Sequence, residues 1–143
     1  MRIESLELTM DSDELEGILK NIDMPQYVRI RRVYFEPGQL LIQMSIIESI
    51  PLYPTLHISV IQASGQTISL HISAPPLEGP AIPLSWELPK GIAYLGRGVV
   101  SLDMIELSKG IISSIKLDGV QLEKGYATIT IAEMDINTLG IIG

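Results

Sequence analysis

The chain has 143 residues, of which 46% are hydrophobic and 19% charged, so it can bury the core of one domain, residues 1–143. Its net charge of −7 and pI of about 4.7 argue against nucleic acid or an anionic membrane as a general partner. The lack of cysteine excludes disulfides, thiol chemistry and cysteine zinc sites. No apolar run reaches the roughly 20 residues that span a bilayer. Residues 1–10 lack the apolar stretch of a signal peptide, so we expect a cytoplasmic protein.

A strand followed directly by a helix is predicted at the start of the chain. The apolar residues of segment 5–10 alternate with polar ones, which is the period of a half-buried strand. Asp11 then stands at the N-cap of a helix, with Glu14 at the capping-box position and Pro25 beyond its end. The helix is predicted from one apolar stripe: Leu15, Ile18, Leu19 and Ile22.

A first hairpin is expected over residues 27–48, with Glu36-Pro37-Gly38 at its tip. A three-residue loop and a two-residue type II turn at Pro37-Gly38 both fit the sequence, and they imply different registers. The three-residue loop places these side chains on one apolar face: Val28, Ile30, Tyr34, Leu40, Ile42, Met44 and Ile46.

Three arginines fall within four positions of the first arm: Arg29, Arg31 and Arg32. On an acidic chain such a group can bind an anion or a phosphate. It is equally typical of a solvated strand face that protects the edge of a sheet, and this is the simpler interpretation.

A second hairpin is expected over residues 55–73, where Leu-His-Ile-Ser occurs twice. A three-residue loop sorts the apolar residues of both arms onto one face, with Ile58 opposite Leu70. The two histidines, His57 and His71, then lie opposite each other on the polar face. They are weak candidates for half of a metal site or for a pH-sensitive spot. Because no third ligand can be placed, we prefer a solvated polar face and expect no cofactor.

A proline-rich segment follows, with five of the nine prolines in residues 75–89. Apolar side chains, including Leu84 and Trp86, interrupt the prolines, so we expect the segment to cover the sheet, a partner or an apolar ligand. The glycine-containing stretch 91–98 is interpreted as a loop.

The last part of the chain predicts a helix and a hairpin. Ser101 is expected to cap the helix, which Gly110 ends. The final hairpin spans about residues 112–133 around a Lys124-Gly125 turn, and Asp118-Gly119 interrupts its alternation as a bulge.

This order of elements resembles a single module of the tubular lipid-binding superfamily, most of all its small bacterial members. The resemblance covers about residues 5–133 and rests on LELTMDSDELEGILKN near the start and KLDGVQLEKGYATITI near the end. It implies lipid binding between a long helix and a curved sheet. The chain departs from the family in its short predicted helices and the absence of an export signal, and no functional residue is carried over.

Together these observations predict an α+β fold: one strongly twisted antiparallel sheet of six to seven strands, with two helices packed on one face. The leading hypothesis is a non-enzymatic module that binds an apolar or lipid-like ligand between helices and sheet. An apolar lid, adaptable methionines and a cationic mouth would form its site: Leu84, Trp86, Met44, Met104, Arg29, Arg31 and Arg32. The alternative is an interaction or assembly subunit, a homo-oligomer without a small-molecule ligand.

Overall fold

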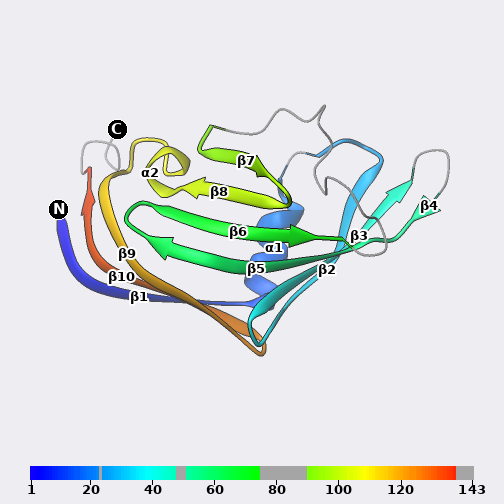
Figure 1. The fold of residues 1–143 in the computed structure, drawn as a ribbon, viewed down its shortest axis with the longest axis horizontal. Coiled ribbons are helices and arrows are strands. Elements are labelled where there is room, and N and C mark those ends of the chain that lie inside the picture. The colour runs from blue at the N-terminus through cyan, green and yellow to red at the C-terminus, as the bar shows by residue number, and fades with distance from the viewer. Residues whose placement is uncertain (23, 48–50, 75–89, 138–143) are drawn as a thin grey trace.

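A computed structural model describes residues 1–22, 24–47, 51–74 and 90–137, and these residues form a mostly-β protein with two antiparallel sheets (Figure 1). The larger sheet has seven strands in the order β2 (Val28–Glu36), β3 (Gln39–Ile47), β5 (Thr55–Ser64), β6 (Thr67–Ser73), β8 (Val99–Asp103) and β7 (Ile92–Gly96), with β4 (Pro51–Leu52) paired to the end of β3. The smaller sheet has three strands in the order β1 (Arg2–Asp11), β10 (Tyr126–Ile136) and β9 (Ile112–Glu123).

Two short helices accompany the sheets, α1 (Ser12–Lys20) and α2 (Met104–Leu107). The expectation of one sheet in an α+β fold is therefore corrected. The opening strand pairs with the last strand and forms a separate sheet with it and β9. The second helix is only four residues long, because the residues assigned to its first turn belong to β8, which pairs on both sides.

The start of α1 is as predicted. The Asp11 carboxylate accepts the backbone N–H of Glu14 at 2.8 Å, and the Glu14 carboxylate accepts the backbone N–H of Asp11 at 3.2 Å. Only half of the predicted apolar stripe packs on the core. Leu15 and Leu19 contact it, whereas the side chains of Ile18 and Ile22 are each 51% exposed. The reason is that the helix lies beside β2, the edge strand, and reaches only the margin of the sheet.

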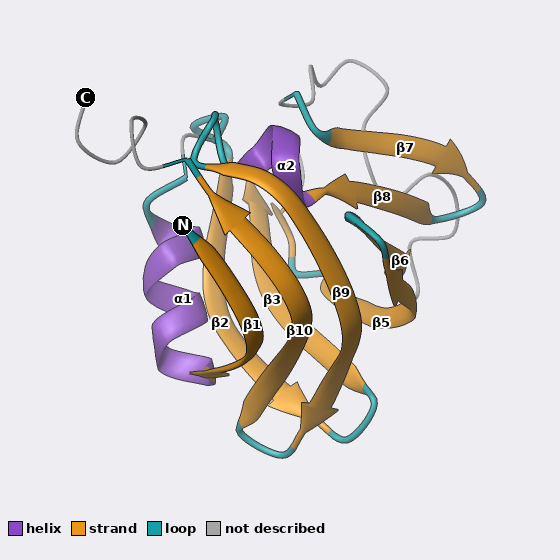
Figure 2. Ribbon diagram, turned by 90° about the vertical axis from the view of Figure 1, so that its left-hand side faces the viewer, coloured by secondary structure: helices purple, strands orange, loops and turns teal. Residues whose placement is uncertain are grey.

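Two core clusters lie on one face of the larger sheet, which we call the inner face. The first, beneath α1, contains Val28, Val33, Ile42, Met44 and Ile58. The second, between the two sheets, contains Ile68, Leu117, Ile131 and Met134. Leu70 packs against both, so the clusters are continuous. Figure 2 shows α1 beside the three-stranded sheet, with β2, β3 and β5 behind them.

The β2–β3 hairpin uses the two-residue turn, with Glu36 paired to Gln39. Gly38 has φ of +78°, the left-handed conformation that a type II turn requires. A bulge at Arg31 then reverses the alternation within β2, so that Val33 is buried on the inner face and Tyr34, expected there, lies on the other face.

The β5–β6 hairpin is also bulged, at Ile61, and turns at Gly65-Gln66. Ile58 pairs with Ile72 instead of Leu70, a shift of two residues from the predicted register. A shift of two preserves the face of every side chain, so the predicted inner set is kept although the pairs are wrong.

The β9–β10 hairpin agrees with its prediction near the turn, but two further register shifts, at Ala132 and Ser113, were not predicted. Its turn is Lys124-Gly125, Val120 pairs with Ile129, and the register shifts at Asp118. Its tip meets the tip of the β2–β3 hairpin and the start of α1. Here the N–H of Gly38 donates to the carbonyl of Leu122 at 2.9 Å, and the N–H of Gly125 donates to that of Phe35 at 3.0 Å.

Residues 91–98, interpreted as a loop, instead contain β7 and its turn into β8. Arg97 and Gly98 both have positive φ, +52° and +77°, which is the signature of a type I′ turn. The N–H of Ile72 donates to the carbonyl of Gly98 at 2.7 Å, and this bond holds the turn against β6. A Cβ on Gly98 would lie 2.5 Å from the carbonyl oxygen of Ile72, so this approach requires glycine.

Candidate functional site

The predicted cationic mouth is divided among three places on β2. The guanidinium of Arg31 lies 5.4 Å from the centroid of the Tyr53 ring, a cation–π contact. Arg32 lies close enough to Glu16 to help lower the pKa of that carboxylate. Arg29 lines a hollow at the end of α1. All three side chains are exposed, and the bulge at Arg31 is what separates them.

The predicted methionines belong to different parts of the core. Met44 is 8% exposed beneath α1, whereas Met104 packs against the cluster between the two sheets. They therefore do not line a common cavity. Leu84 and Trp86, which were expected to cover an apolar ligand or a partner, lie outside the described residues.

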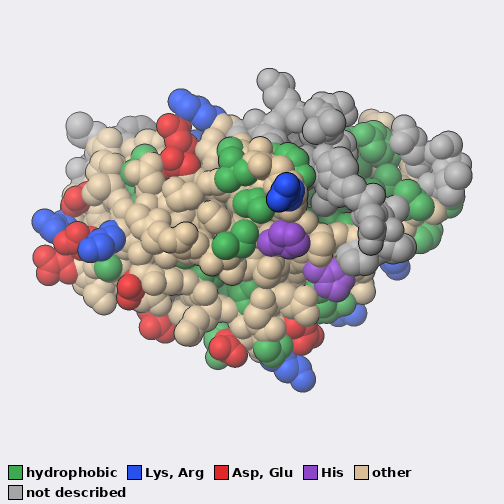
Figure 3. Space-filling view, viewed as in Figure 1, with side chains coloured by type: hydrophobic (Ala, Val, Ile, Leu, Met, Phe, Trp, Pro, Cys, Tyr) green, Lys and Arg blue, Asp and Glu red, His purple; other side chains and the backbone are tan. Residues whose placement is uncertain are grey.

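The histidines are neighbours on the outer face of the larger sheet but are not paired. His57 lies opposite Ser73 and His71 opposite Ser59, because the bulge at Ile61 shifts the register. The ring Nδ1 of His57 lies 3.3 Å from Oε1 of Gln39. Figure 3 shows both rings close together at the surface. In the described ranges no three His, Cys, Asp or Glu side chains are grouped so that they could hold a metal ion.

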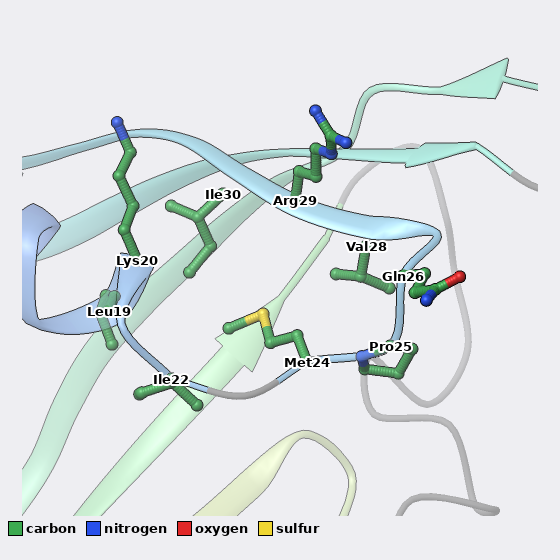
Figure 4. A pocket seen from close by; sticks show the side chains of 9 residues that line it. All are labelled: Leu19, Lys20, Ile22, Met24, Pro25, Gln26, Val28, Arg29 and Ile30. Atoms are coloured by element: carbon green, nitrogen blue, oxygen red, sulfur yellow. The ribbon is translucent and has the colours of Figure 1, made fainter.

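The best candidate for a binding site is a hollow of about 700 Å³ between the end of α1, the segment that follows it and β2. Leu19 comes from the last turn of α1, Met24 and Pro25 from the connection, and Val28 and Ile30 from β2. Figure 4 shows Leu19, Ile22, Met24 and Ile30 around one apolar space.

The local sequence explains why a hollow forms here. Asn21 ends the helix and its N–H donates to the carbonyl of Ile18 at 3.2 Å. Pro25 cannot continue a helix, and its carbonyl accepts the N–H of Val28 at 2.9 Å, which turns the chain into β2. A hollow is thus left between the last turn of α1 and the start of β2.

Two cationic side chains lie at the rim of the hollow, Lys20 and Arg29. In Figure 4 their charged ends lie on the same side of the apolar residues. The ammonium of Lys20 is 3.3 Å from a carboxylate oxygen of Glu16, so its charge is partly engaged. Arg29 forms no ion pair with any described residue. An anion at this rim would therefore meet one free guanidinium and one shared ammonium.

Glu16 lies outside this hollow but fixes α1, whose last turn lines it. One of its carboxylate oxygens accepts the backbone N–H of Val33 at 2.8 Å and the other accepts from Lys20. The bond from Val33, then the bond from Lys20 and the charges of Lys20 and Arg32, lower the pKa of Glu16, against a smaller opposing effect of burial. The carboxylate therefore stays charged and fixes α1 to the edge of the sheet.

Two smaller hollows are less suitable. One, of about 480 Å³, lies beside α2, where Lys90 and Glu106 form an ion pair across 3.3 Å. The other, of about 450 Å³, lies at the start of α1 and is lined by both acidic and basic side chains. The first joins Ile105 and Leu107 to the ammonium of Lys109, but it is smaller and the carboxylate of Glu106 stands in its lining.

Sequence reasoning found Arg29 but not Lys20 or the connection that brings the two together. The signal that could have found them is Met24-Pro25-Gln26 after a helix that ends in lysine. An apolar side chain next to a proline that ends the helix is expected to pack against a neighbouring element.

Among the described residues no helix is long and apolar enough to cross a membrane. The chain matches no protein-family model, no curated protein and no solved structure, so the lipid-binding resemblance remains a prediction.

Proposed function

We propose that this protein is a non-enzymatic module that binds an amphiphilic anion, a lipid-like chain with a carboxylate or phosphate head, in the hollow at the end of α1. The observation that carries the proposal is an apolar floor beside Arg29, a cation without an acidic partner among the described residues, on a chain of net charge −7. The site differs from the one expected between two helices and the sheet, because it lies at the end of α1 alone, beyond the contact of Leu15 and Leu19 with the core.

The two parts of the site recognise the two parts of the ligand. The floor offers side chains that water now reaches, such as Ile22 at 51% exposure, and covering them with a hydrocarbon chain is favourable by about 25 cal/mol per Å². Arg29 presents a planar fork of donors that fits a carboxylate or a phosphate. Lys20 adds a second positive charge to the same rim.

The experiment is titration of the protein with cis-parinaric acid, a fluorescent long-chain carboxylate, followed by its emission. Arg29→Gln is expected to weaken binding about two- to fivefold, because an exposed ion pair contributes little more than this. The matched control is Lys116→Gln on β9, an exposed cation far along the chain from the hollow. Equal binding by the two variants would contradict the proposal.

A second pair of variants tests the floor. Ile22→Ser and Ile18→Ser remove equally exposed isoleucines, and only Ile22 lines the hollow. We expect Ile22→Ser to weaken binding roughly fivefold, since it removes about 1 kcal/mol of apolar contact. Ile18→Ser should bind as the unaltered protein does. An equal loss in both variants would place the ligand elsewhere.

A further inference from the structure

Apart from the two-residue β4, the described part of the two sheets has four edge strands, and β2 is the most completely protected of them. The backbone N–H groups of Val33 and Phe35 point away from β3 and are taken up by side chains of α1. Glu16 accepts the first at 2.8 Å and the Ser12 hydroxyl accepts the second at 3.0 Å. A further strand therefore cannot pair with this edge without displacing the helix.

The edges of the smaller sheet are protected by charge and distortion. On β1, Glu4 and Glu7 are exposed, and Ser5 has φ of +74°, which breaks the regular strand. On β9 the bulge at Asp118 interrupts the edge, and the N–H of Leu117 already donates to the carbonyl of Gly65 at 2.8 Å.

The fourth edge, β7, has none of these protections in the described part of the chain. Its five residues, Ile92–Gly96, carry no charge, and Leu95 is 64% exposed. Its one irregularity, at Leu95, lies next to the turn. Figure 2 shows β7 as the outermost strand on its side of the sheet.

The hydrogen-bond pattern shows which groups of β7 face outward. The N–H of Asp103 donates to the carbonyl of Gly91 at 2.7 Å, so these two residues form a hydrogen-bonded pair. In an antiparallel ladder such pairs alternate, so Ala93 is hydrogen-bonded to β8, whereas Ile92 and Tyr94 direct their N–H and C=O groups away from β8.

We propose that β7 pairs antiparallel with β7 of a second copy of this chain, about a twofold axis at Ala93. This register bonds Ile92 of each copy to Tyr94 of the other. It places the exposed Leu95 opposite Gly91 of the second copy, beside Glu106 and Leu107, which pack against that glycine. The inference is independent of the proposed ligand site, and the pairing extends the seven-stranded sheet through the dimer.

Charge complementarity supports a second copy as the partner. Arg97, directly after β7, has no ion pair among the described residues. In the proposed register Gly96 faces Lys90 of the second copy and Arg97 comes one position further on. Arg97 would therefore share with Lys90 the carboxylate of Glu106, which packs at Gly91 and is 43% exposed. Twofold symmetry makes this contact twice.

Light scattering across a concentration series tests the pairing. The unaltered chain should rise from 15.7 kDa toward twice that mass as its concentration increases. Ala93→Lys, on an exposed position, should remain monomeric because two lysines then meet at the axis, whereas Leu8→Lys on the protected edge β1 should still dimerise. A monomer at every concentration, or a dimer that Ala93→Lys does not weaken, would overturn the proposal.

Cross-linking tests the register itself. The unaltered chain has no cysteine, so Ala93→Cys places one thiol in each copy. Residues facing each other without mutual hydrogen bonds have Cα atoms about 4.5 Å apart, within the range that a disulfide spans. Mild oxidation should therefore link Ala93→Cys into a dimer several times faster than Leu8→Cys. Equal rates would show that Ala93 does not lie at an axis.

Discussion

The core beneath α1 and the core between the two sheets are built from similar side chains but are covered differently. The three-stranded sheet contributes three buried residues of its own, Leu117, Ile131 and Met134. The nine residues of α1 contribute none, and only Leu15 and Leu19 pack downward. A cover that is one helix wide leaves the margin of the sheet open, and this is where the candidate hollow lies. The comparison predicts that α1 is the more easily detached part.

The largest effect should come from emptying the core between the sheets. Ile131→Ala removes a side chain that is only 3% exposed and should lower the free energy of unfolding by about 3 kcal/mol. Leu19→Ala, on the half-buried side of α1, should lower it by about 1 to 2 kcal/mol. Urea denaturation of both variants measures the difference. The reverse order would mean that α1 is the better anchored cover.

A smaller effect should follow from removing the cap of α1. Asp11→Ala deletes the carboxylate that accepts the N–H of Glu14 and should cost about 1 kcal/mol. Hydrogen exchange should accelerate at the amides of α1 and at Val33, and not in β9 or β10, if the helix detaches by itself. Asp13→Ala is the control, since Asp13 lies in the same first turn but is not the cap. Acceleration throughout both sheets would show one cooperative unit.

The smallest effect is a difference in acid sensitivity. The bond from Val33, with lesser help from Lys20 and Arg32, holds the pKa of Glu16 below its ordinary value of 4.5. A group whose pKa is lowered by folding stabilises the folded state above its ordinary pKa, and this contribution is lost as the pH falls through the folded pKa. Glu16→Gln should therefore flatten the loss of stability below pH 4.5, as followed by thermal unfolding.

Asp103 provides the corresponding acid in the other half. The side-chain bond from Gln66, followed by the N–H groups of Glu106 and Ile105, lowers its pKa. Asp103→Asn should likewise reduce the loss of stability as the pH falls, but it should leave the hydrogen exchange of the α1 amides unchanged. A variant at Asp103 that loosens α1 would remove the distinction between the halves.

The sequence predicted which face of the sheet each side chain occupies wherever a local pattern marked a bulge. Asp118-Gly119 is a visible interruption, so the β9–β10 register near the turn could be derived, whereas the shifts at Ala132 and Ser113 were not predicted. The bulges at Arg31 and Ile61 were not recognised, although each falls in a doublet of like polarity, Arg31-Arg32 and Val60-Ile61. A bulge is decided by pairing with a neighbouring strand, which the alternation of one strand does not contain.

The candidate site was harder to predict for the same reason. Arg29 was singled out by the cluster of arginines, but only the bulge separates it from Arg31 and Arg32. Lys20 and Pro25 become neighbours of β2 through the packing of α1 on a sheet margin, a tertiary event that no periodicity records. The two methionines were assigned to one cavity because composition does not reveal that two cores exist.

The junction of the two hairpin tips determines when this protein can fold during synthesis. Gly38 and Phe35 bond to Leu122 and Gly125, and among the described strands β1 pairs only with β10. Contacts of such long sequence separation give a high contact order, which slows folding. On the ribosome the first strand must wait, with its leucines exposed, until nearly the whole chain has emerged. A chaperone that holds residues 1–11 during this interval would be protecting the strand whose partner is made last.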